Sequence, residues 1–312
     1  MRILVVGAGA IGGYFGARLA EAGRDVTFLV RPKRAEQLAQ GLFVLSPKGD
    51  VHLPTPQLVT AATLKEPGRP TGQPYDLVLL SCKAFDLESA IDSFARAMGP
   101  TSVVLPLLNG MGHIERLQKR FGNNAVLGGQ CQISSTLDAE GRVVHLNDWH
   151  TLGFGELDGS RGERIEAVNQ ALSGANLDAQ LSTAILQDMW EKWIFIASMA
   201  GITCLMRASL GDIEGVGGRN IALALFDECA AIAGKNLHVP SATFSERIRK
   251  VLTTPGSTLM ASMLRDAEAH KKTEHEQVLG DLLARAHGVK APILETCLVH
   301  MRAYEARRLR EG

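Results

Sequence analysis

The first twelve residues contain a glycine pattern that suits a bound phosphate. A run of β-branched and apolar residues leads into Gly7, Ala8, Gly9, Ala10, Ile11 and Gly12, and a helix-forming segment follows. In a strand–turn–helix unit the first glycine permits a tight turn, the second lets the backbone approach a pyrophosphate, and the third lets helix and strand pack closely. The helix N-terminus adds free N–H groups and a positive dipole end. We therefore expect these six residues to bind a dinucleotide.

The residues after the second predicted strand favour NADP as that dinucleotide. A carboxylate at this position would bond the ribose hydroxyls of NAD. This chain instead has the cations Arg31, Lys33 and Arg34, which suit a 2′-phosphate. The alternative is a solvated basic turn with no ligand.

Further polar residues stand where a ligand could reach them. Lys83 and Asn109 each follow a predicted strand, and Lys192 lies near the start of a predicted helical region. Because doubly wound sheets bind ligands at the carboxyl edge of their strands, Lys83 and Asn109 are candidate site residues.

The elements that must position these residues are short strands alternating with helices. Continuous apolar runs at 3–6, 26–30, 77–80 and 103–107 are typical of parallel strands covered on both faces. We predict an α/β fold with an N-terminal Rossmann-type, doubly wound parallel sheet.

Beyond about residue 181 the pattern becomes helical. Segments 221–237 and 276–287 carry apolar residues at three- and four-residue spacing, and Pro240, Pro255 and Pro292 interrupt the helices. We predict an NADP-binding Rossmann domain over 1–182 and an all-helical substrate and catalytic domain over 183–312.

Composition limits the function classes. With 46% hydrophobic and 21% charged residues the chain is globular, and 33 basic against 33 acidic residues give no field to attract nucleic acid or an anionic membrane. We expect no membrane span, no metal site and a cytoplasmic location, with apolar helical faces sufficient for a homodimer contact. His270 and His275 are expected on a solvated helix face.

Several motifs in order resemble the ketopantoate reductase family, also called 2-dehydropantoate 2-reductases. They are GAGAIGGYFGARLA at the start, Arg31, the CKA and NGMG segments, WEK, and SMLRD followed by Thr273 and Glu274. The ordered set covers nearly the whole chain and is far more specific than any one motif.

The resemblance implies hydride transfer from NADPH to the ketone carbon of a small 2-oxo acid. It assigns Lys192 as the catalytic proton donor, Asn109 to both cofactor and substrate, and Ser262 to the substrate carboxylate. It assigns Lys83, Ser135 and Glu274 to the cofactor. A straight helix from Ser262 to Glu274 would separate the two by about 18 Å, so they would bind different ligands.

The chain differs from the family at positions that bind the substrate. Family members that act on ketopantoate use asparagines at positions that here hold Ile196, Ala200, Leu210 and Leu259. Apolar side chains offer no hydrogen bonds. Either the substrate is a more apolar 2-oxo acid or ketone, or Ser198, Thr203 and Ser209 replace the lost partners. A third alternative is a sensor that binds NADPH without turnover.

Overall fold

The computed structural model describes residues 1–64 and 73–311, and the chain forms two compact units. The first comprises Met1–Leu108 and His113–Leu186, and the second comprises Asn109–Gly112 and Gln187–Gly312. The boundary predicted from the sequence lies after residue 182. The assignment of Asn109–Gly112 to the helical unit was not predicted.

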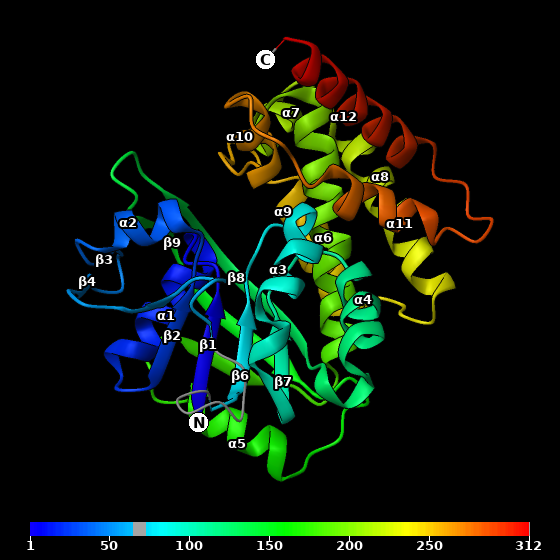
Figure 1. Ribbon diagram of the computed structural model, residues 1–312. Coiled ribbons are helices and arrows are strands. Elements are labelled where there is room, and N and C mark those ends of the chain that lie inside the picture. The colour runs from blue at the N-terminus through cyan, green and yellow to red at the C-terminus, as the bar shows by residue number, and fades with distance from the viewer. Residues whose placement is uncertain (65–72, 312) are drawn as a thin grey trace. The chain divides into compact units, whose positions relative to one another are not determined.

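A five-stranded sheet forms the centre of the first unit (Figure 1). All neighbouring pairs are parallel, in the order β5 (Gln57–Val59), β2 (Asp25–Leu29), β1 (Arg2–Val6), β6 (Tyr75–Leu80), β7 (Met98–Pro106). The connecting helices are α1 (Ala10–Glu21), α2 (Pro32–Leu38), α3 (Leu87–Phe94) and α4 (Gly112–Phe121), with short turns η1 (Ala84–Asp86), η2 (Ala95–Ala97) and η3 (Asn123–Ala125). This Rossmann-type order confirms the predicted fold class.

A second sheet, absent from the sequence prediction, packs on α1. Its order is β10 (Asp178–Leu181), β9 (Val143–Gly155), β3 (Leu42–Leu45), β4 (Val51–Leu53), and β8 (Gly128–Leu137) joins β9 in an antiparallel hairpin. Helix α5 (Glu163–Leu172) precedes β10.

Close packing on both sides fixes α1 between these two sheets. A Cβ added to Gly13 would lie 2.8 Å from Cγ2 of Val143 in β9, and one added to Gly16 would lie 2.4 Å from Cε1 of Phe28 in β2. Every residue from Gly12 to Leu19 is consequently buried.

The second unit is helical, as predicted. It contains most of α6 (Ile185–Met206), then α7 (Leu210–Gly215), α8 (Arg219–Lys235), α9 (Ala242–Leu252), α10 (Ser262–Glu268), the π-helical segment η4 (Glu276–Gly280), α11 (Asp281–Ala284) and α12 (Pro292–Glu311). The helix predicted over 276–287 is present but shorter, because its first turn is π-helical and α11 ends at Ala284. Among the described residues, no helix combines the length and apolarity that crossing a bilayer requires.

Helix α12 is capped by a residue from another helix. Its first residue is Pro292, and the preceding Ala291 has no polar side chain with which to cap the helix. Glu228 of α8 accepts hydrogen bonds from Ile293 N at 3.1 Å and Leu294 N at 2.8 Å. A carboxylate at a helix N-terminus also interacts favourably with the helix dipole. Glu228 therefore ties α12 to α8.

We predict that Glu228→Ala lowers the free energy of unfolding by about 1.5–3 kcal/mol, because two charge-assisted hydrogen bonds are lost. The adjacent Asp227→Ala is the control. Asp227 pairs with Arg249 at side-chain exposures of 54% and 41%, and its loss should cost under about 1 kcal/mol. Urea unfolding of both variants measures the difference, and equal losses would refute the capping role.

Candidate functional site

The turn between β1 and α1 is held in one conformation by its glycines. Gly7 has φ +92°, and its N–H donates to Leu29 O at 2.9 Å. A Cβ on Gly12 would lie 2.1 Å from both Gly7 O and Ser81 Oγ, so no side chain fits there. The Ser81 hydroxyl donates to Val6 O, at 3.0 Å, and to Gly7 O, at 3.1 Å. Ser81 is not among the site residues predicted from the sequence.

This turn fits the pyrophosphate of a dinucleotide. Gly9 is the N-cap of α1 and provides no side-chain cap, so the first helical N–H groups have no such acceptor. Apart from Gly9 itself, its chain neighbours and the backbone of α1, no described atom comes within 4 Å of a Cβ built on Gly9, which leaves room beside the backbone. A helix N-terminus with open space and unshielded donors is suited to an anion.

The three predicted cations after β2 take different positions. Arg31 is the N-cap residue of α2, with a side chain 73% exposed, and its Nη2 lies 3.0 Å from Asp86 Oδ2. Lys33 is exposed, whereas Arg34 is half-buried and donates from Nε to Ala8 O at 2.9 Å. Only Arg31 and Lys33 therefore present their charge at the surface.

Two other predicted cofactor residues lie in the same unit. Lys83 is exposed and directly precedes η1 at the carboxyl end of β6. Ser135 in β8 donates its hydroxyl to Ala10 O at 3.2 Å. Ser135 thus contacts the glycine turn itself, and its contact with a cofactor stays a prediction.

In the second unit, three segments far apart in sequence meet around Trp193. The indole Nε1 of this fully buried residue donates to Val278 O in η4 at 2.8 Å. A Cβ on Gly110 would lie 2.7 Å from Gln277 O and 3.8 Å from Trp193 Cε2. The NGMG segment, α6 and η4 are therefore packed together, although the sequence analysis gave Trp193 no role.

That packing places three of the predicted site residues on adjoining segments. Asn109 precedes Gly110, Lys192 precedes Trp193 on α6 and is half-buried, and Glu274 is half-buried two residues before η4. An amide, an ammonium and a carboxylate are thus carried by one assembly of packed backbone.

Ser262 begins α10 and is exposed. The straight helix considered between Ser262 and Glu274 does not exist, because α10 ends at Glu268 and His270 has φ +53°. The 18 Å separation based on it therefore does not apply.

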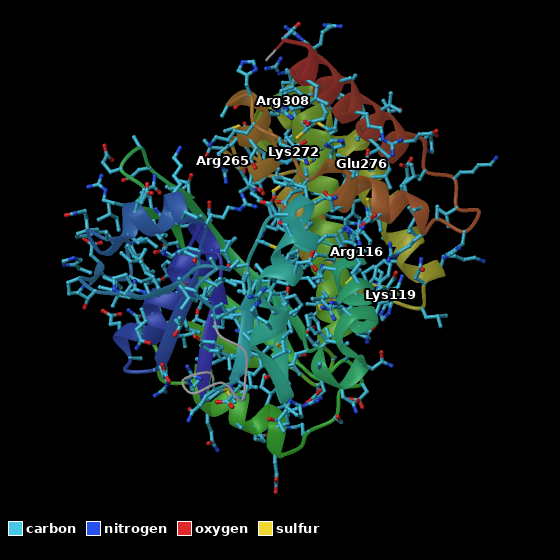
Figure 2. The ribbon with its side chains drawn as sticks, in the orientation of Figure 1. Arg116, Lys119, Arg265, Lys272, Glu276 and Arg308 are labelled. Carbon is cyan, nitrogen blue, oxygen red and sulfur yellow. The ribbon has the colours of Figure 1, made fainter. Side chains whose placement is uncertain are left out.

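His275 is not on a solvated face, which corrects the sequence analysis, whereas His270 is exposed as expected. Nδ1 of His275 lies 2.9 Å from Thr273 Oγ1, and burial is the main reason that the pKa of His275 is lowered. The neighbouring Glu276, labelled in Figure 2, accepts two hydrogen bonds from Arg302, which hold the pKa of that carboxyl below its usual range. These contacts anchor η4 to α12.

Among the described residues no cluster of three metal-ligating side chains occurs.

The apolar positions differ in exposure. Leu210 and Ala200 are buried, whereas Ile196 and Leu259 are half-buried, and Leu210 N donates to Leu259 O at 3.0 Å. Leu210 and Ala200 are therefore part of the core, and only Ile196 and Leu259 retain surface that a ligand could contact.

The hydroxyl groups considered as replacements donate elsewhere. Ser198 Oγ donates to Ile194 O and Thr203 Oγ1 to Met199 O, each at 2.7 Å, and both residues are fully buried. Ser209 Oγ donates to Asp212 Oδ2 at 2.5 Å within the capping box of α7. These contacts argue against the replacement hypothesis.

Comparisons with known proteins agree with this architecture. The family model Ketopantoate reductase PanE/ApbA matches residues 3–159, and the model Ketopantoate reductase PanE/ApbA C terminal matches residues 184–305. The Bacillus subtilis protein named Uncharacterized oxidoreductase YkpB is 39% identical over 99% of this chain and 100% of its own.

Two solved structures share the fold. 2-Dehydropantoate 2-reductase from Geobacter metallireducens superposes with a TM-score of 0.86 at 25% identity, covering 97% of this chain and 99% of its own. D-mandelate dehydrogenase with NADH and anilino(oxo)acetate gives a TM-score of 0.86 at 20% identity, covering 99% of both chains. The two-unit fold, the glycine turn and the matches along both units together show that this chain is an oxidoreductase of the ketopantoate reductase family.

Proposed function

We propose that this protein reduces a small 2-oxo acid to a 2-hydroxy acid with NADPH, in a reaction of the 2-dehydropantoate 2-reductase type. The observation that supports this most strongly is the packing of NGMG, α6 and η4 around Trp193, which carries Asn109, Lys192 and Glu274 on adjoining backbone. An ammonium and an amide carried on adjoining segments suit a carbonyl oxygen that becomes negatively charged.

The glycine turn from Gly7 to Gly12 would hold NADPH, which would supply a hydride for the ketone carbon. Lys192 donates a proton to the carbonyl oxygen as charge develops there, so that a hydroxyl group results. The Asn109 amide orients that oxygen and the nicotinamide ribose, and the Ser262 hydroxyl bonds the substrate carboxylate. Lys83, Ser135 and Glu274 complete the contacts that we assign to the cofactor.

The choice of NADPH rests on the charge after β2. Arg31 is exposed at 73%, and the residues from Val30 to Arg34 include no carboxylate that could bond a ribose hydroxyl.

A second candidate is a reductase for a more apolar 2-oxo acid or ketone. It is favoured because Ile196 and Leu259 are the half-buried members of the four apolar positions, while Ser198, Thr203 and Ser209 donate to other groups. The fold is compatible with such ligands, since D-mandelate dehydrogenase was solved with anilino(oxo)acetate. Tight NADPH binding without turnover of any oxo acid would instead favour a sensor.

We predict that Lys192→Ala lowers kcat for the best 2-oxo acid by at least about 100-fold, because the proton donor is lost. The Kd for NADPH should stay within about twofold, since Lys192 acts on the substrate oxygen. NADPH absorbance and cofactor titration provide the two readouts. Lys250→Ala, an exposed lysine on α9, is the control. A loss below about tenfold would remove Lys192 from the proposed mechanism.

Arg31→Ala should raise the Kd for NADPH by about 10- to 100-fold, because a charge-assisted contact with the 2′-phosphate disappears. The Kd for NADH, which has no such phosphate, should change by less than about twofold. Fluorescence titration with both dinucleotides measures the ratio. Lys119→Ala on α4, labelled in Figure 2, removes an exposed positive charge elsewhere and should change neither constant. Equal losses for both dinucleotides would contradict the assignment.

A substrate panel distinguishes the two candidates. If apolar residues contact the substrate, kcat/KM for an aryl or branched aliphatic 2-oxo acid should exceed kcat/KM for ketopantoate by at least about tenfold. Polar groups of ketopantoate would then lack hydrogen-bond partners, which disfavours its binding. Ile196→Asn should lower the ratio of these two kcat/KM values. Ile221→Asn, at a partly exposed isoleucine on α8, should leave the ratio unchanged. A preference of the unsubstituted protein for ketopantoate would exclude the apolar candidate.

A further inference from the structure

Arg34 is bonded to two backbone segments that lie far apart in sequence. Its Nε donates to Ala8 O in the glycine turn at 2.9 Å, and its Nη1 donates to Gly141 O at 2.8 Å and to Gln37 Oε1 at 3.1 Å. Nη2 is buried and has no hydrogen-bond partner among the described residues. Burial also lowers the pKa of the Arg34 guanidinium. This cation thus faces backbone carbonyls, unlike its exposed neighbours.

The hydrogen bond to Ala8 O has a geometric consequence for the next residue. In a planar trans peptide the carbonyl and the following N–H point in opposite directions. Holding Ala8 O toward Arg34 therefore directs the Gly9 N–H away from it. Beside Gly9 there is also open space, because no described atom outside α1 and the chain neighbours of Gly9 lies within 4 Å of a Cβ added there.

The neighbouring carbonyls of the turn are held in the same manner. Gly7 O accepts from Ser81 Oγ at 3.1 Å, Gly9 O from Gly13 N at 2.8 Å, and Ala10 O from Ser135 Oγ at 3.2 Å. With Arg34 on Ala8 O, the carbonyls of residues 7–10 all have partners. The turn is therefore pre-organised, which reduces the entropy that a ligand must offset on binding.

The far end of the Arg34 bridge is itself rigid. Gly141 lies in the turn between β8 and β9 with φ +78°. Arg142 donates from N and Nε to the two carboxylate oxygens of Asp138, at 2.8 and 2.7 Å, and Gly141 N donates to Asp138 O at 3.1 Å. The hairpin turn therefore presents Gly141 O from a fixed position.

We propose that Arg34 is a positioning residue that aims the Gly9 N–H at the cofactor pyrophosphate by linking the glycine turn to the β8–β9 hairpin. This inference rests on the proposed function, because it requires a dinucleotide in the turn. It separates the roles of two nearby cations: Arg31 discriminates between dinucleotides, whereas Arg34 supports both equally, because NADPH and NADH share the pyrophosphate.

The test compares Kd values for NADPH and NADH in Arg34→Met. Both should rise by about tenfold or more, as expected for loss of charge-assisted hydrogen bonds, with their ratio within about twofold of the original. kcat at saturating NADPH should change less than about threefold, so the effect appears in KM. Arg34→Lys should restore part of the affinity, because an ammonium can still donate to Ala8 O.

Gly141→Ala approaches the same bridge from the hairpin. A Cβ there would lie 2.8 Å from Arg34 Nη1. Both dinucleotides should bind more weakly, and the effect should be less than additive with Arg34→Met, as for residues in contact. Gly23→Ala is the matched control: its φ of +76° imposes the same backbone strain, but no described atom beyond its chain neighbours lies within 4 Å of its added Cβ. It should leave both Kd values unchanged.

A loss confined to NADPH in Arg34→Met would overturn the proposal, because Arg34 would then contact the 2′-phosphate. Unchanged affinities, or full additivity with Gly141→Ala, would overturn it as well. If Arg34→Met does not fold, Arg34→Lys and Gly141→Ala decide the matter by the same ratio. Failure of the unsubstituted protein to bind either dinucleotide would instead refute the proposed function, and this inference with it.

Discussion

The structure of the first unit depends on the close approach of Gly12 to the backbone of Gly7. Because a Cβ at Gly12 would lie 2.1 Å from Gly7 O, helix α1 can begin immediately after β1 only with glycine there. Once begun, α1 is enclosed by β2 on one side and by β9 on the other, through Gly16 and Gly13. The N-terminus of α1 is thereby fixed, and its free N–H groups face a defined direction. A polar turn of this kind needs partners for its carbonyls, and residues as distant as Ser81 and Ser135 provide them.

In the second unit, a single large side chain holds separate segments together. Trp193 is fully buried, and its indole N–H donates to Val278 O, so the polar group is satisfied while the ring packs. The close approach of Gly110 to Gln277 O brings the NGMG segment to the same place. Segments from three parts of the chain are thus held by packing and by the hydrogen bond from Trp193 to Val278 O.

The sequence predicted the parts of this architecture that depend on local pattern. The apolar runs at 3–6, 26–30 and 77–80 became β1, β2 and β6, since strands buried on both faces carry no polar alternation. The glycine turn was identified for the same reason, because its spacing is local. Strands β3, β4 and β10 of the second sheet were missed because they have only three or four residues each and half-exposed patterns. Neither the inward orientation of Arg34 nor the burial of His275 could be predicted, because both depend on contacts made by the folded chain.

The ion pair between Arg31 and Asp86 has a consequence for how an anion would enter. A guanidinium already held by a carboxylate is partly ordered before any ligand arrives, so little side-chain entropy remains to be lost. The incoming group must, however, displace or share that carboxylate, and a doubly charged phosphate competes better for the arginine than a singly charged one. Any anion that binds Arg31 therefore competes with the Asp86 carboxylate, and the exposure of the pair limits the free energy of that competition.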